Sequence, residues 1–169
     1  MKKAVLGLGT NLGDRLENLN RAIEALGLLP GTRVTKVSGL YETAPFDVPD
    51  PQEDYLNCCV LVETELSPRA LLGGCLGIEA AMGRRRSGYH SARVIDMDLL
   101  MYEGEKSGDP ELRLPHPGIL ERGFVLVPLG DLFPEKKAFD LDFSREYGRV
   151  SSADVWPASP SLSKGLRAP

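Results

Sequence analysis

Six segments in the order strand, helix, strand, strand, helix, strand constrain the fold of this chain more than any other feature. Runs rich in β-branched or aromatic residues predict the strands, and apolar side chains repeated at helical spacing predict the helices. The strands are predicted at residues 3–8, 33–43, 55–65 and 93–102, and the helices begin after Asp14 and Ser67. We expect a β-α-β-β-α-β unit whose first and last strands are central neighbours.

Local signals predict the ends of both helices. Asp14 is a typical N-cap with Glu17 at the capping-box position, and Gly27 ends the first helix. Ser67 is an N-cap followed by a proline at the first helical position, and Gly83 ends the second helix. The order of these elements is typical of an α+β, ferredoxin-like sandwich with an antiparallel sheet, and a C-terminal extension follows it here.

The length and composition predict one domain with a short tail. A chain of 169 residues suffices for a single hydrophobic core, which we expect within residues 1–150. Residues 114–118 predict a rigid turn and residues 119–131 short helices. Ser, Pro and Ala dominate residues 151–169, so we expect a loosely held tail with Trp156 as its anchor.

Charge and cysteine content exclude several classes. The net charge of −4 argues against a general nucleic-acid or membrane-surface binder. The odd number of cysteines, without a Cys-x-x-Cys pair, favours reduced thiols at Cys58, Cys59 and Cys75. The apolar run after Met1 is too short for a secretory signal or a membrane span. We therefore expect a cytoplasmic protein with neither nucleic acid nor membrane as a partner.

Two carboxylates, Asp96 and Asp98, lie in the apolar run of residues 93–102. Because side chains of a strand alternate between faces, a spacing of two places both carboxylates on one side. Such a pair is a template for a divalent cation. The alternative is the polar face of an edge strand, where paired acids are ordinary.

A basic segment precedes the two aspartates. Arg84, Arg85, Arg86 and Arg93 occur with no acidic residue from position 80 to 95, so the local charge changes sign within a few residues. Magnesium-bound polyphosphate requires both signs of charge. A solvated loop or a localisation-type basic run would give the same pattern.

Two further polar residues are candidates for ligand contacts. Glu79, near the end of the second helix, either reaches a nucleotide hydroxyl or faces water. His116 lies between two prolines, where it can donate a hydrogen bond to a phosphate oxygen.

Nucleotide-binding glycine motifs do not account for this chain. The glycines at positions 7, 9 and 13 follow a strand, but their G-x-G-x-x-x-G spacing differs from the dinucleotide-binding pattern. The sequence also has no G-x-x-x-x-G-K-[ST] loop, so side chains and metal must hold any nucleoside triphosphate. The arginines are therefore the main candidates for binding its phosphate groups.

Several motifs in the same order resemble the 6-hydroxymethyl-7,8-dihydropterin pyrophosphokinase family of folate biosynthesis, over most of residues 4–130. These motifs are GLGTNLGD (7–14), YETAPF (41–46), YLN (55–57), Glu79 with GRRR (83–86), RVIDMD (93–98), LPHP (114–117) and RGF (122–124). The resemblance implies a ferredoxin-like α+β fold and an ATP-dependent diphosphotransferase. Such an enzyme moves the β,γ-pyrophosphoryl group of ATP onto the pterin hydroxymethyl oxygen and releases AMP.

The resemblance also implies roles for residues. Asp96 and Asp98 would hold two magnesium ions, and with Arg84 and Arg93 they form the catalytic set. The implied ATP contacts are Glu79, Arg84, Arg86, Arg93, Leu99, His116 and Arg122. The implied pterin pocket comprises Thr43, Ala44, Pro45, Phe46, Tyr55, Asn57 and Phe124. The expected partners are ATP and a reduced pterin, on a monomer.

The chain departs from the family before the aspartates, where His90, Ser91 and Ala92 replace a Trp-Gly-Pro segment. The lost indole and proline would change the cover over the site and the stiffness of that loop. Two other functions stay open. One is a metal-dependent nucleotidyl- or glycosyltransferase that uses the Asp-x-Asp pair. The other is a ferredoxin-like regulatory or RNA-binding module, although the central strands lack the paired aromatics that stack bases.

Overall fold

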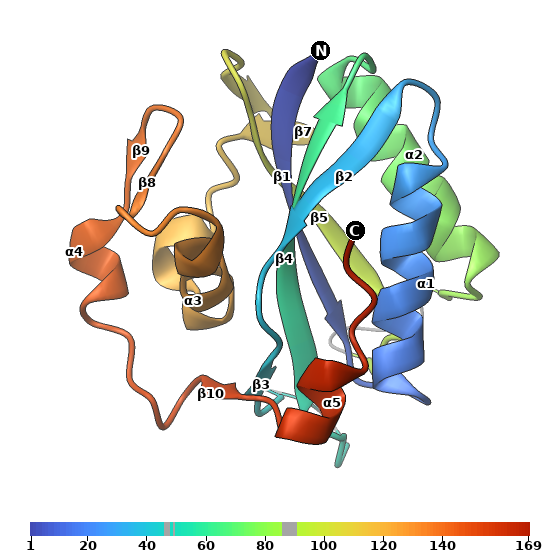
Figure 1. Ribbon diagram of the computed structural model, residues 1–169, viewed down its shortest axis with the longest axis vertical. Coiled ribbons are helices and arrows are strands. Elements are labelled where there is room, and N and C mark those ends of the chain that lie inside the picture. Colours follow the sequence, from blue (N-terminus) through green and yellow to red (C-terminus); the bar gives the residue numbers. More distant parts are fainter. Residues whose placement is uncertain (46–47, 49, 86–90) are drawn as a thin grey trace.

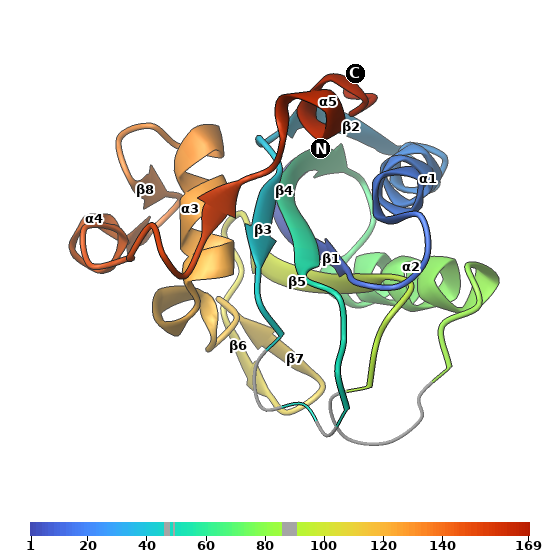
Figure 2. The ribbon, with the colours of Figure 1, turned by 90° about the horizontal axis from the view of Figure 1, so that it is seen from below.

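The computed structural model describes residues 1–45, 48, 50–85 and 91–169. These residues form three layers, with an antiparallel sheet between helices (Figure 1). Helices α1 (Arg15–Gly27) and α2 (Pro68–Ala81) cover one face of the sheet, and α3 (Gly123–Leu132) covers the other (Figure 2). The mixed α/β fold with an antiparallel sheet agrees with the sequence-based prediction.

Six described strands form the main sheet. They are β1 (Lys2–Thr10), β2 (Thr32–Val37), β3 (Tyr41–Thr43), β4 (Tyr55–Thr64), β5 (Asp96–Tyr102) and β10 (Trp156–Pro157). Their order is β10-β3-β4-β1-β5, with β2 also paired to β4. The first and last strands of the predicted unit, β1 and β5, are neighbours as expected. However, β5 lies at the edge of the sheet, and the strands paired on both sides are β1, β4 and β3.

The strand predicted at residues 33–43 divides into β2 and β3. Ser38 interrupts it, because its hydroxyl oxygen accepts a hydrogen bond from the Cys59 N–H at 2.9 Å. The next residue, Gly39, donates its N–H to Asp131 Oδ2 on α3 at 3.0 Å instead of continuing the ladder. The Ser38 N–H still donates to the Cys59 carbonyl at 2.9 Å, but side chains take the next two positions of the ladder that the sequence pattern predicts as unbroken.

Both predicted helix starts are confirmed. The Asp14 carboxylate accepts a hydrogen bond from the Glu17 N–H at 3.0 Å, and the Ser67 hydroxyl oxygen accepts one from the Ala70 N–H at 3.3 Å. The chain leaves α2 through Gly83, whose φ of +86° falls in the left-handed region that favours glycine. The caps thus fix the two helices that face the same side of the sheet.

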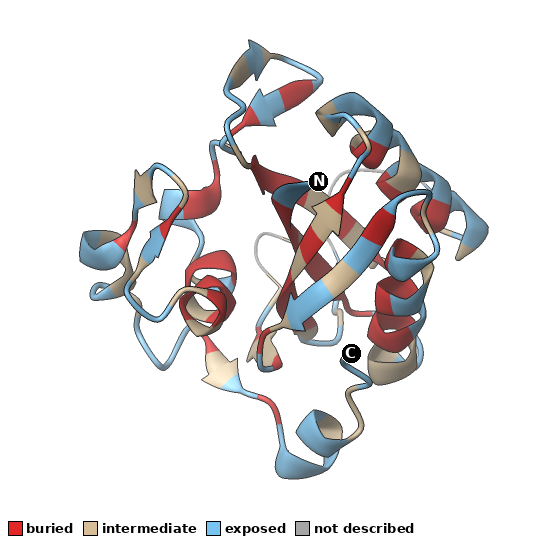
Figure 3. Ribbon diagram, turned by 45° about the horizontal axis from the view of Figure 1, so that its top comes forward, coloured by how far each residue is buried: buried red, intermediate tan, exposed pale blue. Residues whose placement is uncertain are grey.

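The two faces of the sheet carry separate cores (Figure 3). Leu6 and Leu8 of β1 pack toward α1 and α2, whereas Val5 packs toward α3. Gly7 and Gly9 follow Val5 on the α3 side at alternate positions, so β1 presents bare backbone to that side beyond Val5. The α3 face is therefore packed at one end and open at the other.

Short elements follow the central unit. They are β6 (Ser107–Asp109), β7 (Leu112–Leu114), η1 (Ile119–Glu121), β8 (Lys137–Ala138), β9 (Leu141–Asp142), α4 (Ser144–Tyr147) and α5 (Pro160–Lys164). The short helices predicted at residues 119–131 correspond to η1 and α3. None of the helices in the described ranges is long and apolar enough to cross a membrane.

Residues 151–169 contact both the sheet and α1. Strand β10 pairs with β3, and the Ala158 N–H donates to the Leu40 carbonyl at 2.9 Å. Asn20 of α1 donates to the Gly165 carbonyl at 3.0 Å and accepts from the Arg167 N–H at 2.8 Å. The segment is thus held more closely than the loose tail that composition predicts. Its backbone groups make these hydrogen bonds, and composition gives no indication of them.

Candidate functional site

Asp96 and Asp98 project from β5 on the face opposite to α1 and α2. Met97 between them is buried in the core on the helical side. In the register of β1 and β5, Gly7 lies beside Asp98 and Gly9 beside Asp96. Because neither glycine has a side chain, the two carboxylates border open space at this end of the sheet.

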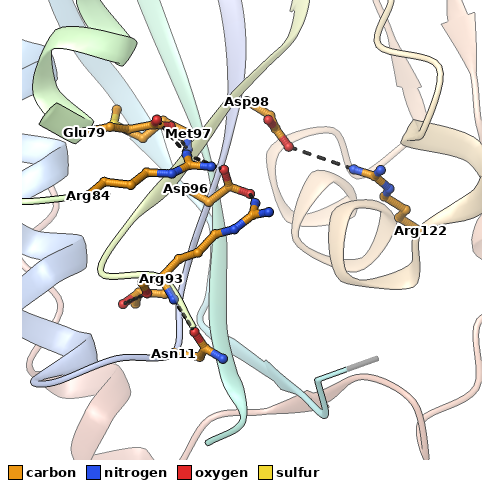
Figure 4. Close-up of polar contacts among 9 residues, drawn as sticks. Asn11, Glu79, Arg84, Arg93, Asp96, Met97, Asp98 and Arg122 are labelled. Atoms are coloured by element: carbon orange, nitrogen blue, oxygen red, sulfur yellow. Dashed lines mark hydrogen bonds and ion pairs between the residues drawn. The ribbon is translucent and has the colours of Figure 1, made fainter. Parts of the chain in front are cut away.

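Arginines converge on the carboxylates (Figure 4). Arg84 Nη1 lies 2.8 Å from Asp96 Oδ1, and Arg93 Nη1 lies 3.1 Å from Asp96 Oδ2. Arg122, which immediately precedes α3, approaches from the opposite side, with Nη1 3.9 Å from Asp98 Oδ2. The structure thus brings together three of the predicted arginines around the predicted metal ligands.

Glu79 joins α2 to the strand that carries the aspartates. One of its carboxylate oxygens accepts a hydrogen bond from the Met97 N–H at 2.8 Å, and the other lies 2.6 Å from Arg84 Nη1. The side chain is buried, and burial raises its pKa. Glu79 therefore does not face water: it holds both β5 and an arginine of the site.

Asn11, which sequence reasoning did not single out as a site residue, anchors Arg93. The Asn11 side-chain oxygen accepts from the Arg93 N–H at 2.8 Å, and the Asn11 N–H donates to the Arg93 carbonyl at 3.1 Å. Its side-chain nitrogen donates to the Glu53 carbonyl at 3.3 Å. The turn after β1 thereby holds both the segment before β5 and the segment before β4. The sequence feature that could have identified Asn11 was its place in the glycine-rich turn of residues 9–13.

The electrostatics of the aspartates suit a divalent cation. Burial, and then the charge of Asp96, raise the pKa of Asp98 to about 6. Two neighbouring carboxylates that repel each other gain stability from a cation between them. No group of three or more His, Cys, Asp and Glu side chains suited to a metal occurs among the described residues. Two carboxylates nevertheless fit magnesium, which takes its other oxygen ligands from phosphate and water.

A cavity of about 960 Å³ borders the aspartates. Six of the seven residues predicted for the pterin pocket line it, namely Thr43, Ala44, Pro45, Tyr55, Asn57 and Phe124. Arg93, Asp96, Asp98 and Arg122 line the same cavity. The predicted contacts Phe46 and Arg86, and the altered position His90, lie outside the described residues. Candidate ligands of metal, phosphate and a flat ring therefore share one space.

Buried polar groups and aromatic rings line this cavity together. Asn57, itself buried, donates from its side-chain nitrogen to Thr43 Oγ1 at 3.0 Å. Tyr55 lies on the same strand as Asn57, and Phe124 on α3 is partly exposed. The Arg122 guanidinium lies 5.9 Å from the centre of the Phe124 ring. Such a combination of amide and flat apolar walls suits a planar heterocycle.

Two further predicted ATP contacts, His116 and Leu99, are not among the residues that line this cavity. The His116 Nδ1 accepts a hydrogen bond from the Gly118 N–H at 3.0 Å, which leaves Nε2 as the N–H donor of a neutral ring. Burial, and then Arg122, lower the pKa of His116. The Leu99 side chain is buried in the core on the helical side, so only its backbone can reach a ligand.

Other parts of the cavity had a weaker sequence signal. Gly7 and Gly9 form its floor, and their period of two within a strand was the available signal. Residues of the C-terminal segment also line the cavity: Arg149, Val150, Ser151, Ala153, Asp154, Val155 and Trp156. The composition of residues 151–169 predicts a tail and gives no sign of a cavity wall.

Arginines around mutually repelling carboxylates suit a polyphosphate with its cations, and the aromatic walls suit a flat acceptor. The class that this geometry defines is a transferase that uses a nucleoside triphosphate. The model of the 7,8-dihydro-6-hydroxymethylpterin-pyrophosphokinase (HPPK) family matches residues 5–134. The chain belongs to this family.

Curated relatives agree with the family match. The 2-amino-4-hydroxy-6-hydroxymethyldihydropteridine pyrophosphokinase of Methylorubrum extorquens is 47% identical over 135 residues, which cover 80% of this chain and 85% of the relative. The Synechocystis enzyme of the same name is 37% identical over 164 residues, covering 96% of this chain and 83% of the relative.

Solved structures share the fold at low sequence identity. An HPPK-DHPS structure in complex with substrates gives a TM-score of 0.64 at 16% identity, covering 87% of this chain and 43% of that one. Wild-type HPPK-DHPS of Plasmodium falciparum also gives a TM-score of 0.64, at 18% identity, covering 88% of this chain and 41% of that one. This chain thus spans less than half the length of these solved chains.

Proposed function

We propose that this protein transfers the β,γ-pyrophosphoryl group of ATP to the hydroxymethyl oxygen of 6-hydroxymethyl-7,8-dihydropterin and releases AMP, as a step of folate biosynthesis. One observation carries the proposal: a single cavity is lined both by Asp96, Asp98 and Arg93 and by the Tyr55, Asn57 and Phe124 walls. The acceptor hydroxyl and the triphosphate can therefore meet without a covalent enzyme intermediate.

Asp96 and Asp98 are proposed to hold two magnesium ions. Bound magnesium neutralises charge on the triphosphate and polarises the attacked β-phosphorus. The pterin hydroxyl oxygen forms the new bond to that phosphorus, the bond from the β-phosphorus to the oxygen of AMP breaks, and the hydroxyl proton leaves to solvent. Asp96 and Asp98 would hold the cations on the side of the sheet that carries the cavity.

The arginines are proposed to exchange partners when the substrates bind. Arg84 and Arg93 neutralise Asp96 in the unliganded protein, at 2.8 and 3.1 Å. With Asp96 holding a cation, both guanidinium groups would be available as bidentate donors to phosphate oxygens. Arg86, Arg122 and the Nε2–H of His116 are further proposed phosphate donors, and Glu79 and the Leu99 backbone proposed contacts of the nucleotide.

The pterin is proposed to lie between Tyr55 and Phe124. Asn57 and Thr43 would bind the polar edge of the ring, and Ala44, Pro45 and Phe46 would close the pocket. Support comes from the buried Asn57–Thr43 hydrogen bond, which fixes the amide orientation before a ligand arrives. A pre-oriented amide binds a complementary ring edge with little further loss of side-chain freedom.

We propose that residues 1–150 form the pyrophosphokinase unit and that residues 151–169 are a C-terminal extension of it. The strand order supports ferredoxin-like connectivity within this unit, because β1 lies between β5 and β4, and β2 and β3 lie beyond β4. We further propose that the protein acts as a cytoplasmic monomer, since one chain supplies every group named above.

The test is incubation of the protein with ATP, magnesium and 6-hydroxymethyl-7,8-dihydropterin, followed by nucleotide analysis. We expect AMP and the pyrophosphorylated pterin in equal amounts, and no AMP without magnesium or pterin. Formation of ADP, or no nucleotide product, would contradict the proposal. Binding of a nucleotide sugar without pterin binding would instead favour the Asp-x-Asp glycosyl- or nucleotidyltransferase.

A further inference from the structure

We propose that residues 149–157, here called the strap, position the pterin-binding walls and form a wall of the pterin site themselves. This inference rests on the proposed function. The strap lies beyond residue 134, where the family match ends. Three independent contacts support its role: with the start of α3, with β3 and with the cavity.

The first contact fixes the start of α3. A Cβ atom placed on Gly123 would lie 3.0 Å from Val150 Cγ1 and 3.0 Å from Val155 Cγ2. Both valines of the strap therefore pack directly against the first residue of the helix, and any side chain there would displace them. Gly123 lies between Arg122, which faces Asp98, and Phe124, which forms one aromatic wall.

The second contact fixes β3. Trp156 and Pro157 pair with Glu42 and Tyr41 in the main sheet. The following residue of β3 is Thr43, the hydrogen-bond partner of Asn57. The strap therefore continues directly from the α3 wall to the strand that carries the polar wall, as Figure 2 shows for β10 and β3.

The third contact is with the cavity itself. Arg149, Asp154 and Trp156 all line it. Trp156 is the only tryptophan of the chain and is partly buried. Its backbone pairs with Glu42 of β3 next to the proposed pterin pocket, so its indole can report on events at this wall.

The phosphate-binding side of the site has separate supports. Glu79 and Asn11 hold the residues around Asp96, through contacts with Met97 and Arg93. Within the described part of the chain, the hydrogen bonds and ion pairs of these two side chains do not involve the strap. Arg122 lies next to Gly123, so the strap also bears on one proposed phosphate donor. Loosening the strap should therefore weaken pterin binding more strongly than nucleotide binding.

Steady-state kinetics of Val155→Ala tests this separation, with Leu162→Ala as the matched control. Leu162 lies in α5 and packs against the core on the α1 side, so its truncation loosens the C-terminal segment away from the cavity. We expect Val155→Ala to raise the KM for the pterin about tenfold and to leave the KM for ATP within about twofold. Leu162→Ala should change neither KM. An unchanged pterin KM in folded Val155→Ala would overturn the proposal.

Should Val155→Ala fail to fold, Gly123→Ala provides the same test from the other side of the contact, because its new methyl group displaces both valines. Direct binding gives an independent measurement. Titration of the protein with 6-hydroxymethyl-7,8-dihydropterin should change the emission of Trp156 to saturation, with Trp156→Phe as the blank.

The two proposals fail in different ways. Pterin binding without AMP formation would remove the proposed function, while the emission titration still decides the role of the strap. AMP formation together with calorimetric pterin binding and an unchanged Trp156 emission would remove the strap from the site and leave the proposed function intact.

Discussion

The two faces of the central sheet differ in completeness. On the side of α1 and α2, β1 contributes Leu6 and Leu8, both almost wholly buried. On the side of α3, the same strand contributes Val5 to a core and then Gly7 and Gly9 to the floor of a cavity. Leu6 and Leu8 thus serve stability, whereas Gly7 and Gly9 of the same strand border the cavity. Substitutions at successive positions of β1 should therefore differ in effect, with some lowering stability and others changing the kinetics.

The largest expected effect is the loss of activity on the open face. Asp98→Asn should lower kcat/KM by about 10³-fold or more, because the transition state loses a charge that holds its cations. Asp140→Asn, an exposed site on the turn between β8 and β9, is the control and should keep full activity. Nearly normal turnover of Asp98→Asn would exclude the metal role.

The same substitution should not destabilise the metal-free protein. The pKa of folded Asp98, about 6, lies above its ordinary value of 3.8. Folding therefore favours the protonated form, and the penalty for the charged form is fully present above pH 6 and absent below about pH 4. At pH 7 the melting temperature of Asp98→Asn should equal or exceed that of the parent protein, whereas at pH 3.5 the two should be similar. A clear decrease at pH 7 would contradict this assignment.

Next in size is a loss of stability from the packed face. Leu6→Ala should reduce the free energy of unfolding by about 2–5 kcal/mol, because it leaves a cavity in a fully buried core. Urea titration measures the change, and kinetics under folding conditions should show KM values close to those of the parent protein. A large rise in the pterin KM would mean that the two faces are coupled.

A smaller effect distinguishes the two floor glycines. A Cβ on Gly9 would lie 3.0 Å from Asn57 Oδ1, whereas a Cβ on Gly7 would lie 3.3 Å from the flexible Leu100 Cδ1. We expect Gly9→Ala to raise the pterin KM about tenfold, since it displaces the amide that would bind the ring edge. Gly7→Ala, the matched control, should raise it less. Equal effects would indicate that lost volume alone matters.

The smallest effect compares one tyrosine from each face. The Tyr41 hydroxyl donates to Asp131 Oδ2 at 2.8 Å, linking β3 to α3, and the Tyr102 hydroxyl donates to the Leu66 carbonyl at 2.7 Å on the other side. Each Tyr→Phe substitution should cost about 1 kcal/mol of stability in thermal unfolding. Only Tyr41→Phe should also raise the pterin KM, by about twofold. The same kinetic change in Tyr102→Phe would argue against face-specific roles.

Short-range signals predicted the central elements of the fold well. Asp14 and Ser67 act as N-caps because their hydrogen bonds close within three residues, a distance at which sequence alone is informative. The spacing of Asp96 and Asp98 likewise fixes one face of β5 through local geometry. The resemblance to the family supplied the grouping of Thr43, Tyr55, Asn57 and Phe124, which no local pattern predicts.

Long-range pairings escaped prediction. The interruption at Ser38 depends on Cys59, and the position of the C-terminal segment depends on β3 and on Asn20, nearly the whole chain away. The role of Glu79 depends on its burial against Met97, which helical spacing does not give. In each case the folded sheet brings a polar group close to its partner. Neither composition nor periodicity can therefore predict the pairing.

The position of β5 at the border of the main sheet has a consequence for association between molecules. Exposed border strands invite another chain to extend the sheet, which is a common route to aggregation. Here the Met97 N–H is taken by the Glu79 carboxylate, and the Leu100 carbonyl by the His116 N–H at 2.7 Å. Two backbone groups of the strand that carries Asp96 and Asp98 are thus already paired within the chain, which disfavours the addition of a further strand at this border.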